Sequence, residues 1–253
     1  MKFIIPSFQR PDILKQKTLN LLINTYNVRS EDIDILLEDP KEGDTYRNVL
    51  GDLYTKDFIF HYQKGIGSVR NFIKHYYKYE TKETKVIYID DDIDEIRIMD
   101  KQLPNLIDFV NEMFKETENR KLNLWGVSAF HNPFFMSNTI TQSLKYICGA
   151  FNGEIIDRDK HDIYTEFDHL EDFAFSCEHF IRDGGVVRNN GVCIVTKYFG
   201  DGGINASYGG LEKRKIAMAK AVIEFKERYG DMCKIIEKKY GADIRLNHWY
   251  KNE

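Results

Sequence analysis

The sequence has 253 residues, with 36 Lys and Arg against 40 Asp and Glu and a formal net charge of −4. This length fits one large domain or two small ones, and a hydrophobic content of 42% is globular, which argues against a disordered or collagen-like polymer. The charge argues against a strongly basic nucleic-acid binder of the histone kind, although it does not exclude a basic patch on one face of the protein. Because there are only five prolines, we expect one compact unit rather than domains on long linkers.

The four cysteines are far apart, and none of them lies in a C-x-x-C pair. The pattern therefore supports neither a zinc ribbon nor a redox motif, and buried free thiols in a reducing compartment are the simplest interpretation. No window approaches the roughly 18 apolar residues that a membrane span needs. The first residues also lack the apolar core of a signal peptide. These features predict a cytoplasmic protein without a membrane partner.

Short β-branched or aromatic runs alternate with helical stretches in the first half, which is typical of α/β proteins with a mainly parallel sheet. We predict a helix over residues 11–26, and a second helix after Gly65 that is capped by Ser68. The run 86–89 is apolar enough to be a central strand, and it leads directly into the acidic run 90–94. The predicted strands of this half cover residues 3–6, 33–37, 58–61 and 86–89.

The pattern becomes less regular in the second half, where we expect helices near 103–119 and from about 171 to 183. The apolar pattern of residues 186–195 predicts a strand, or a hairpin interrupted at 189–191. Glycine-rich residues 200–210 are expected to form a mobile loop, and residues 211–240 to form long amphipathic helices. Two further strands are predicted over residues 122–130 and around 143–152.

The acidic run after the fourth strand is the most informative feature. In open α/β sheets the ligand site lies outside the carboxyl ends of the strands, so acidic side chains at that edge project into the crevice. Four carboxylates within residues 90–94 repel one another unless a cation compensates them. Oxygen ligands without nearby His or Cys suit Mg²⁺ or Mn²⁺. The alternative is a solvated acidic turn in which Asp92 or Asp94 caps a helix.

Three segments together resemble GT-A glycosyltransferases, particularly family 2-like members. They are Ile-Pro-Ser-Phe-Gln-Arg-Pro at 5–11, Gly-Ser-Val-Arg-Asn at 67–71 and Val-Ile-Tyr-Ile-Asp-Asp-Asp at 86–92. The resemblance covers about the first hundred residues. It implies an α/β, Rossmann-like GT-A fold, a nucleotide-sugar donor, with a UDP-sugar as first candidate, and Mn²⁺ or Mg²⁺. It also divides the chain into a catalytic domain over 1–210 and a basic helical extension over 211–253 packed on that domain.

The resemblance further assigns roles to individual residues. The first-strand turn lies against the nucleotide, Arg70 faces the phosphates or the acidic run, and Asp39 accepts a hydrogen bond from the nucleobase. For Asp39 a plain strand-ending turn is the alternative, and for Arg70 a surface ion pair. The implied donor-binding residues are Pro6, Ser7, Arg10, Asp39, Arg70, Asp90 and Asp91. The implied metal ligands are Asp90 and Asp92, which as alternate residues leaving a strand should point to the same side, together with His248.

An inverting transferase needs a base for the acceptor hydroxyl, and the family supplies it from an acidic pair at the start of a helix. Glu171 and Asp172 fit that position, and Asp172 is our choice of base. The alternative is that Asp168 or Glu171 only caps the helix.

The second half is also similar to the TET-associated glycosyltransferases of bacteriophages, which act on hydroxymethylated pyrimidines in DNA and would work in the host cytoplasm. Residues 211–253 hold eleven Lys and Arg and seven Asp and Glu, so this segment could meet DNA phosphates, with a solvated helix surface as the alternative. A small-molecule or glycan acceptor, a GT-A-like nucleotidyltransferase and a non-catalytic nucleic-acid-binding module are the competing interpretations. The oligomeric state stays open.

Overall fold

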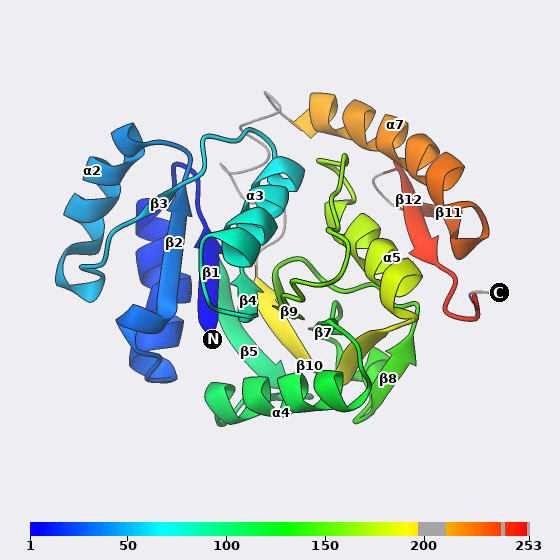
Figure 1. Ribbon diagram of the computed structural model, residues 1–253, viewed down its shortest axis with the longest axis horizontal. Helices are drawn as coiled ribbons and strands as arrows, with labels where there is room; N and C mark the ends of the chain where they lie inside the picture. The colour runs from blue at the N-terminus through cyan, green and yellow to red at the C-terminus, as the bar shows by residue number, and fades with distance from the viewer. Residues whose placement is uncertain (197–210, 239–240, 252–253) are drawn as a thin grey trace.

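The computed structural model describes residues 1–196, 211–238 and 241–251, and it has a ten-stranded sheet at its centre (Figure 1). The strand order is β3-β2-β1-β4-β9-β7-β10-β5-β6, with β8 paired to β10. The strands are β1 (Lys2–Pro6), β2 (Ile33–Leu37), β3 (Ile59–Phe60), β4 (Lys85–Ile89), β5 (Ile93–Ile98), β6 (Lys101–Gln102), β7 (Leu124–Ser128), β8 (Ile140–Ser143), β9 (Phe151–Ile155) and β10 (Val186–Thr196).

The N-terminal half of the sheet is parallel. Strands β3, β2, β1 and β4 pair side by side in the same direction, with Phe3 opposite both Ile33 and Ile87. Strand β9 then runs antiparallel between β4 and β7, and β10 is parallel to β7 but antiparallel to β5 and β8. The predicted α/β class is confirmed.

Helices cover both faces of the sheet because successive side chains of the buried strands point to opposite sides. Phe3 and Ile5 pack in the core beneath one group of helices, whereas Ile4 packs on the other face. The first face is covered by α1 (Pro11–Leu14) with its π-helical continuation to Thr25, by α2 (Pro40–Leu50) and by α4 (Leu106–Asn119). The second face is covered by α3 (Ile66–Tyr79) and α5 (Glu171–Asp183).

A buried group of charged and polar side chains ties α3 and α5 to the sheet. Lys74 Nζ lies 3.1 Å from Glu154 Oε1, and Tyr88 donates to Glu154 Oε2 at 2.8 Å. His179 of α5 lies 3.2 Å from the same carboxylate. Although burial alone would raise it, Lys74 and His179 lower the pKa of Glu154 to about 2. The group therefore fixes the two helices whose N-terminal ends face the cleft described below.

Three differences from the predicted elements lie in the first half. Residues 40–50 form α2, which the sequence analysis missed: Asp39 accepts from Lys41 N at 2.8 Å as the N-cap, and Pro40 is the first helical residue. Residues after the acidic run form strand β5, where the sequence analysis assigned no element. Ser68 does not cap α3, because the helix begins two residues earlier, at Ile66, after Gly65.

The second half departs further from the prediction. Residues 144–150 form a loop, so the strand expected around 143–152 is wrong except at its ends. β10 is one continuous strand whose register shifts between Asn189 and Cys193. The expected helix from 211 is present as α7 (Leu211–Tyr229), but the chain then forms the hairpin β11 (Cys233–Lys238) and β12 (Gly241–Leu246). The expected mobile loop at 200–210 lies outside the described residues.

Helix α7 and the hairpin pack against α5 through apolar side chains. Phe180 of α5, Val222 and Phe225 of α7 and Leu246 of β12 belong to one buried cluster. The ring of Phe225 also lies 5.4 Å from that of Phe167, in the loop before α5. Within the described part of the chain, no helix has the length and apolar character to cross a bilayer.

Candidate functional site

A cleft of about 1840 Å³ lies at the carboxyl ends of the parallel strands. Ser7, Asp39, His61 and Asp90 follow closely on the ends of β1, β2, β3 and β4, and all of them line it. Because parallel strands end at the same edge of a sheet, residues far apart in the sequence meet here. The predicted site residues that line the cleft are Pro6, Ser7, Arg10, Asp39, Arg70, Asp90, Asp91, Glu171, Asp172 and His248.

The middle aspartate of the acidic run, Asp91, is almost fully buried and binds the first-strand turn. Ser7 Oγ donates to Asp91 Oδ2 at 2.6 Å, and the Arg10 guanidinium contacts both carboxylate oxygens. Burial raises the pKa of Asp91, whereas Arg10 and Ser7 oppose the increase. Asp91 therefore anchors the turn that was predicted to lie against a nucleotide.

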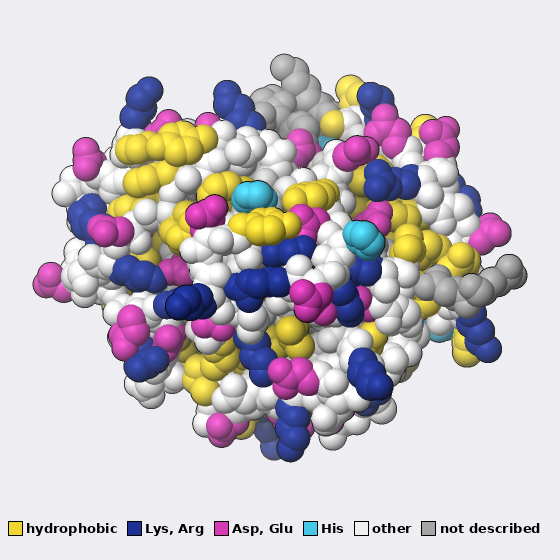
Figure 2. Space-filling model, in the orientation of Figure 1, with side chains coloured by type: hydrophobic (Ala, Val, Ile, Leu, Met, Phe, Trp, Pro, Cys, Tyr) yellow, Lys and Arg dark blue, Asp and Glu magenta, His cyan; other side chains and the backbone are white. Residues whose placement is uncertain are grey.

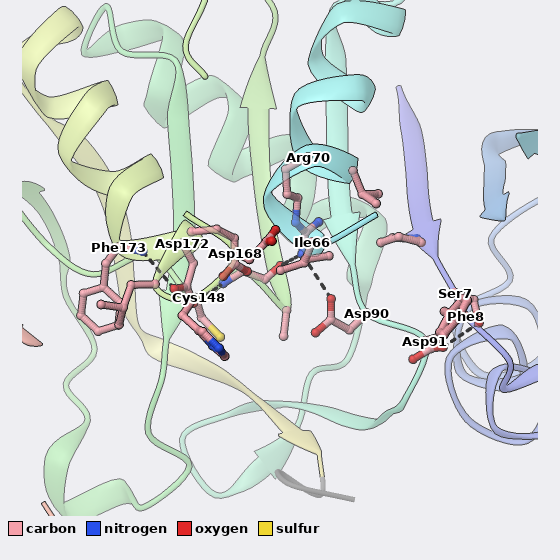
Figure 3. A pocket seen from close by; sticks show the side chains of 18 of the residues that line it. Ser7, Phe8, Ile66, Arg70, Asp90, Asp91, Cys148, Asp168, Asp172 and Phe173 are labelled. Carbon is pink, nitrogen blue, oxygen red and sulfur yellow. Dashed lines mark hydrogen bonds and ion pairs between the residues drawn. The ribbon is translucent and has the colours of Figure 1, made fainter. Parts of the chain in front are cut away.

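Asp90 and Asp92 do not point to the same side. Asp92 Oδ1 accepts from Thr196 Oγ1 at 3.0 Å, and its Oδ2 lies 3.4 Å from Arg10, so its carboxylate is held outside the cleft lining. The Asp90 side chain is 38% exposed and faces Arg70 (Figure 3). The expectation of alternation fails because the strand ends at Ile89, and the acidic run turns into β5.

Arg70 is a buried cation beside Asp90. Its Nη2 donates to Asp90 Oδ1 at 3.3 Å and to the Gly149 carbonyl at 2.8 Å, and its guanidinium carbon lies 5.2 Å from the Tyr88 ring centroid. Its Nη1 is buried without a hydrogen-bond partner within the described residues. The side chain is thus fixed at the edge of the cleft, with one donor buried and unpaired among the described residues.

Asp168 caps α3 from a distance of about a hundred positions in the chain. Its Oδ1 accepts from Gly67 N at 3.2 Å, and a Cβ on Gly65 would lie 2.1 Å from that oxygen. Gly65 also has φ +84°, which favours glycine. Asp168 therefore does not cap α5, whose N-cap residue is Leu170.

Asp172 lies at the start of α5, where three donors converge on its carboxylate. Tyr146 OH and Gly149 N, the latter at 3.4 Å, donate to Oδ2, and Phe173 N donates to Oδ1 at 2.9 Å. Burial raises the pKa of Asp172, while these donors oppose the increase. The sequence analysis assigned no role to Tyr146 and Gly149, which fall in the segment expected to be a strand.

Glu171 differs from its neighbour in its surroundings. Burial, and then the negative charge of Asp172, raises the pKa of Glu171 well above its usual range, although Arg70 opposes the increase. Two adjacent carboxyl groups in one site ionise in separate steps. Because the three donors favour the charged form of Asp172, the first negative charge of the pair resides on Asp172.

This difference predicts a pH effect. As Glu171 ionises, its charge makes the neighbouring Asp172 more basic, so kcat/KM should rise with pH through an apparent pKa above the usual range of a glutamate. Glu171→Gln should remove that rise, whereas Glu178→Gln, a change farther along α5, should keep it. The measurement is kcat/KM between pH 6 and about pH 9.5 in buffers of constant ionic strength. Identical profiles for Glu171→Gln and the unchanged protein would contradict the assignment.

His248 lies among cations instead of carboxylates. Burial and the neighbouring Lys145 and Arg188 lower its pKa. Within the described residues, no three His, Cys, Asp or Glu side chains are grouped as metal ligands. The structure thus does not bring His248 together with Asp90 and Asp92.

Comparison with known proteins supports the fold. No protein-family model matches the sequence, and no curated protein matches it significantly. A mannosyltransferase of Pyrobaculum calidifontis, solved with GDP-Man and Mn²⁺, superposes with a TM-score of 0.52 at 10% identity, over 89% of this chain and 64% of that one. A mycobacterial protein superposes with a TM-score of 0.51 at 9% identity, over 97% and 82%.

Residues 1–349 of S. aureus TarS give a TM-score of 0.47 at 13% identity, over 89% of this chain and 66% of that one. The chain therefore spans about two thirds of the length of TarS and of the mannosyltransferase. At these identities the likeness concerns the fold alone. The chain has the GT-A-type α/β fold that the sequence resemblance implied.

Proposed function

We propose that this protein is a metal-dependent glycosyltransferase, which moves a sugar from a nucleotide-sugar donor to an acceptor hydroxyl with inversion. The observation that carries the proposal is that Gly149 connects the Arg70–Asp90 ion pair to Asp172 through its backbone. Its carbonyl accepts from Arg70, which contacts Asp90, and its N–H donates to Asp172. The edge of the parallel sheet and the acidic pair of α5 are thus held at a fixed separation across one cleft (Figure 3).

The donor would lie on the sheet side of the cleft, against the Ser7 turn and Asp39, with a UDP-sugar as first candidate. Arg70, which lines the cleft beside Asp90, would supply a fixed positive charge for the diphosphate. A divalent ion with one or two protein carboxylates and substrate phosphates suits this site, in which Asp90 offers the accessible carboxylate. Mg²⁺ or Mn²⁺ bound there would stabilise the departing diphosphate as a Lewis acid. Asp92 could bind the ion as well only if it lost its hydrogen bond from Thr196 and its ion pair with Arg10.

On the opposite side, Asp172 would accept the proton of the attacking hydroxyl. Its position at the start of a helix favours the carboxylate form, and Tyr146 fixes the orientation of the side chain. Attack from the face opposite the leaving diphosphate accounts for inversion. Glu171 would tune the basicity of Asp172 through its own ionisation.

For the acceptor, we propose a hydroxymethylated pyrimidine in phage DNA, modified in the host cytoplasm. The basic content of residues 211–253 supports contact with a polyanion. Figure 2 shows Lys and Arg interspersed with Asp and Glu over the visible face, which is also compatible with a small-molecule or glycan acceptor. A non-catalytic nucleic-acid-binding module would leave the acidic pair of α5 without a role.

Thermal unfolding with a panel of nucleotide sugars, with Mn²⁺ or with a chelator, tests the proposal. A donor at about 100 times its Kd should raise Tm by about 5 to 10 °C for a chain of this size. We expect this increase for one nucleotide sugar and only with the metal. Equal Tm values with and without Mn²⁺ for every nucleotide sugar would leave only a binding module.

A further inference from the structure

Two cationic side chains and a histidine come together in the lining of the cleft. Lys145 follows β8, Arg188 lies in β10 and His248 follows β12, and all three line the cleft. Lys145 and Arg188 are half-buried, and His248 is exposed. Three segments that are far apart in the sequence thus contribute these side chains to one cleft.

Some cations of the cleft have acidic partners: Arg10 pairs with Asp91, Arg70 pairs with Asp90, and Lys238 pairs with Asp243. For Lys145 and Arg188 no carboxylate lies within ion-pair distance among the residues that the structure describes. The same holds for three exposed cations of the lining, Lys41, Lys64 and Arg245, whereas Lys145 and Arg188 are half-buried. A half-buried cation without a counter-ion is unfavourable, and an anion bound from outside would compensate it.

The Arg188 guanidinium is held in place by neutral acceptors. Its Nε donates to Asn190 Oδ1 at 2.8 Å, and its Nη1 donates to the Tyr146 carbonyl at 3.4 Å. The fixed planar group therefore keeps donors free for the cleft, and its geometry suits the paired oxygens of a phosphate. Lys145 makes no hydrogen bond or ion pair within the described part of the chain, so its amine can turn toward a bound anion.

Mutual repulsion among the three groups agrees with this geometry. Burial, and then Arg188, lowers the pKa of Lys145. Burial, and then Lys145 and Arg188, lowers the pKa of His248. Lys145 and Arg188 therefore make this part of the cleft positive, which favours a bound anion, and the negative charge of that anion would in turn favour protonation of His248.

We propose that Lys145, Arg188 and His248 form a binding site for a phosphate group of the acceptor. Tyr146 connects this site to the base, because its carbonyl accepts from Arg188 and its hydroxyl donates to Asp172. A phosphate held here would fix the attacking hydroxyl relative to Asp172. The interpretation as an acceptor site rests on the proposed function, whereas the anion site itself does not. The phosphate belongs either to a phosphodiester chain or to a small phosphorylated molecule.

Calorimetric titration with two probes tests the site: glycerol 3-phosphate and a single-stranded DNA oligonucleotide containing hydroxymethylcytosine. The donor side is kept occupied by a nucleoside diphosphate and Mn²⁺ if these bind. The variants are Lys145→Gln, Arg188→Gln and His248→Gln, with Arg29→Gln as the control, since Arg29 lies outside the cleft lining, is 67% exposed and pairs with Asp32. Removing one charged donor should weaken phosphate binding about tenfold in Lys145→Gln and Arg188→Gln and leave binding by Arg29→Gln unchanged.

Binding of either probe that weakens in Lys145→Gln and Arg188→Gln supports the site, and the probe that binds identifies the phosphate as part of a chain or of a small molecule. Equal affinity in all variants, or no binding of either probe to the unchanged protein, overturns it. Arg188→Gln also removes the hydrogen bond to the Tyr146 carbonyl. Lys145→Gln removes no contact within the described residues, so a loss of binding in this variant reports the phosphate site alone. If a nucleoside diphosphate binds but the affinity for both probes is the same in all variants, only the phosphate site is refuted. If probe binding depends on Lys145 but no nucleotide sugar binds, only the proposed glycosyl transfer is refuted.

Discussion

Asp172→Asn is expected to lower kcat by about 100- to 10,000-fold, which is the usual contribution of general base catalysis. The amide cannot accept a proton from the acceptor hydroxyl. It can keep two of the three contacts, because Oδ1 still accepts from Phe173 N, and the Tyr146 hydroxyl can rotate to accept from the new amide; only the long hydrogen bond from Gly149 N, at 3.4 Å, is lost. The loss should therefore appear in turnover, while Tm and nucleotide-sugar affinity stay near those of the unchanged protein.

The matched control for Asp172→Asn is Glu178→Gln, which changes a carboxylate on the same helix. Glu178 accepts from Tyr229 at 2.7 Å and pairs with Arg228, away from the cleft lining. The Glu178→Gln variant should have a kcat within about twofold of that of the unchanged protein, because substitutions outside a site seldom alter the stability of the transition state. Turnover by Asp172→Asn close to that of Glu178→Gln would remove Asp172 from the mechanism.

Asp90→Asn is expected to abolish the metal-dependent part of donor binding and to lower kcat/KM by about 100-fold or more, since a bound ion contributes several kcal/mol of charge stabilisation. Asn keeps the size of the side chain and the acceptor for Arg70, but it lacks the negative charge that a divalent ion needs. The Mn²⁺ concentration giving half-maximal activity, measured at a fixed donor concentration, reports the effect directly.

Asp94 provides the control within the same acidic run. Its side chain lies on β5, is 43% exposed and pairs with Lys17 at 2.9 Å, so it takes no part in the cleft. Asp94→Asn should keep the metal dependence of the unchanged protein. If Asp90→Asn and Asp94→Asn respond to Mn²⁺ alike, the ion is not held by Asp90.

Sequence patterns predicted the parallel half of the fold well because its strands are short apolar runs that end at polar residues. Ile87 and Ile89 face one helical layer, and Tyr88 faces the other, so β4 is apolar throughout, as expected for a strand buried on both faces. The same reasoning placed Asp90 and Asp39 at one edge of the sheet. Helix α2 was missed because Pro40 after an acidic pair is typical both of a strand-ending turn and of a helix start.

Side-chain partners were less predictable than positions. Asp90, Asp91 and Asp92 are identical in type, yet one faces the cleft, one is buried against Ser7 and Arg10, and one binds Thr196. Which environment each receives depends on the turn between β4 and β5, and local sequence does not determine that turn. The hairpin after α7 was also hidden, because residues 233–246 alternate charged and apolar residues much as an exposed helix can.

The most direct test of the central claim is a ³¹P spectrum of the nucleotide sugar that binds, recorded during incubation with the protein and Mn²⁺. We expect a nucleoside diphosphate to accumulate, slowly when water is the acceptor and faster when the acceptor is added, and a chelator to stop its formation. A nucleoside triphosphate together with a sugar phosphate, formed when pyrophosphate is added, would show nucleotidyl transfer at the same cleft. That result, with no nucleoside diphosphate in any reaction, would contradict glycosyl transfer.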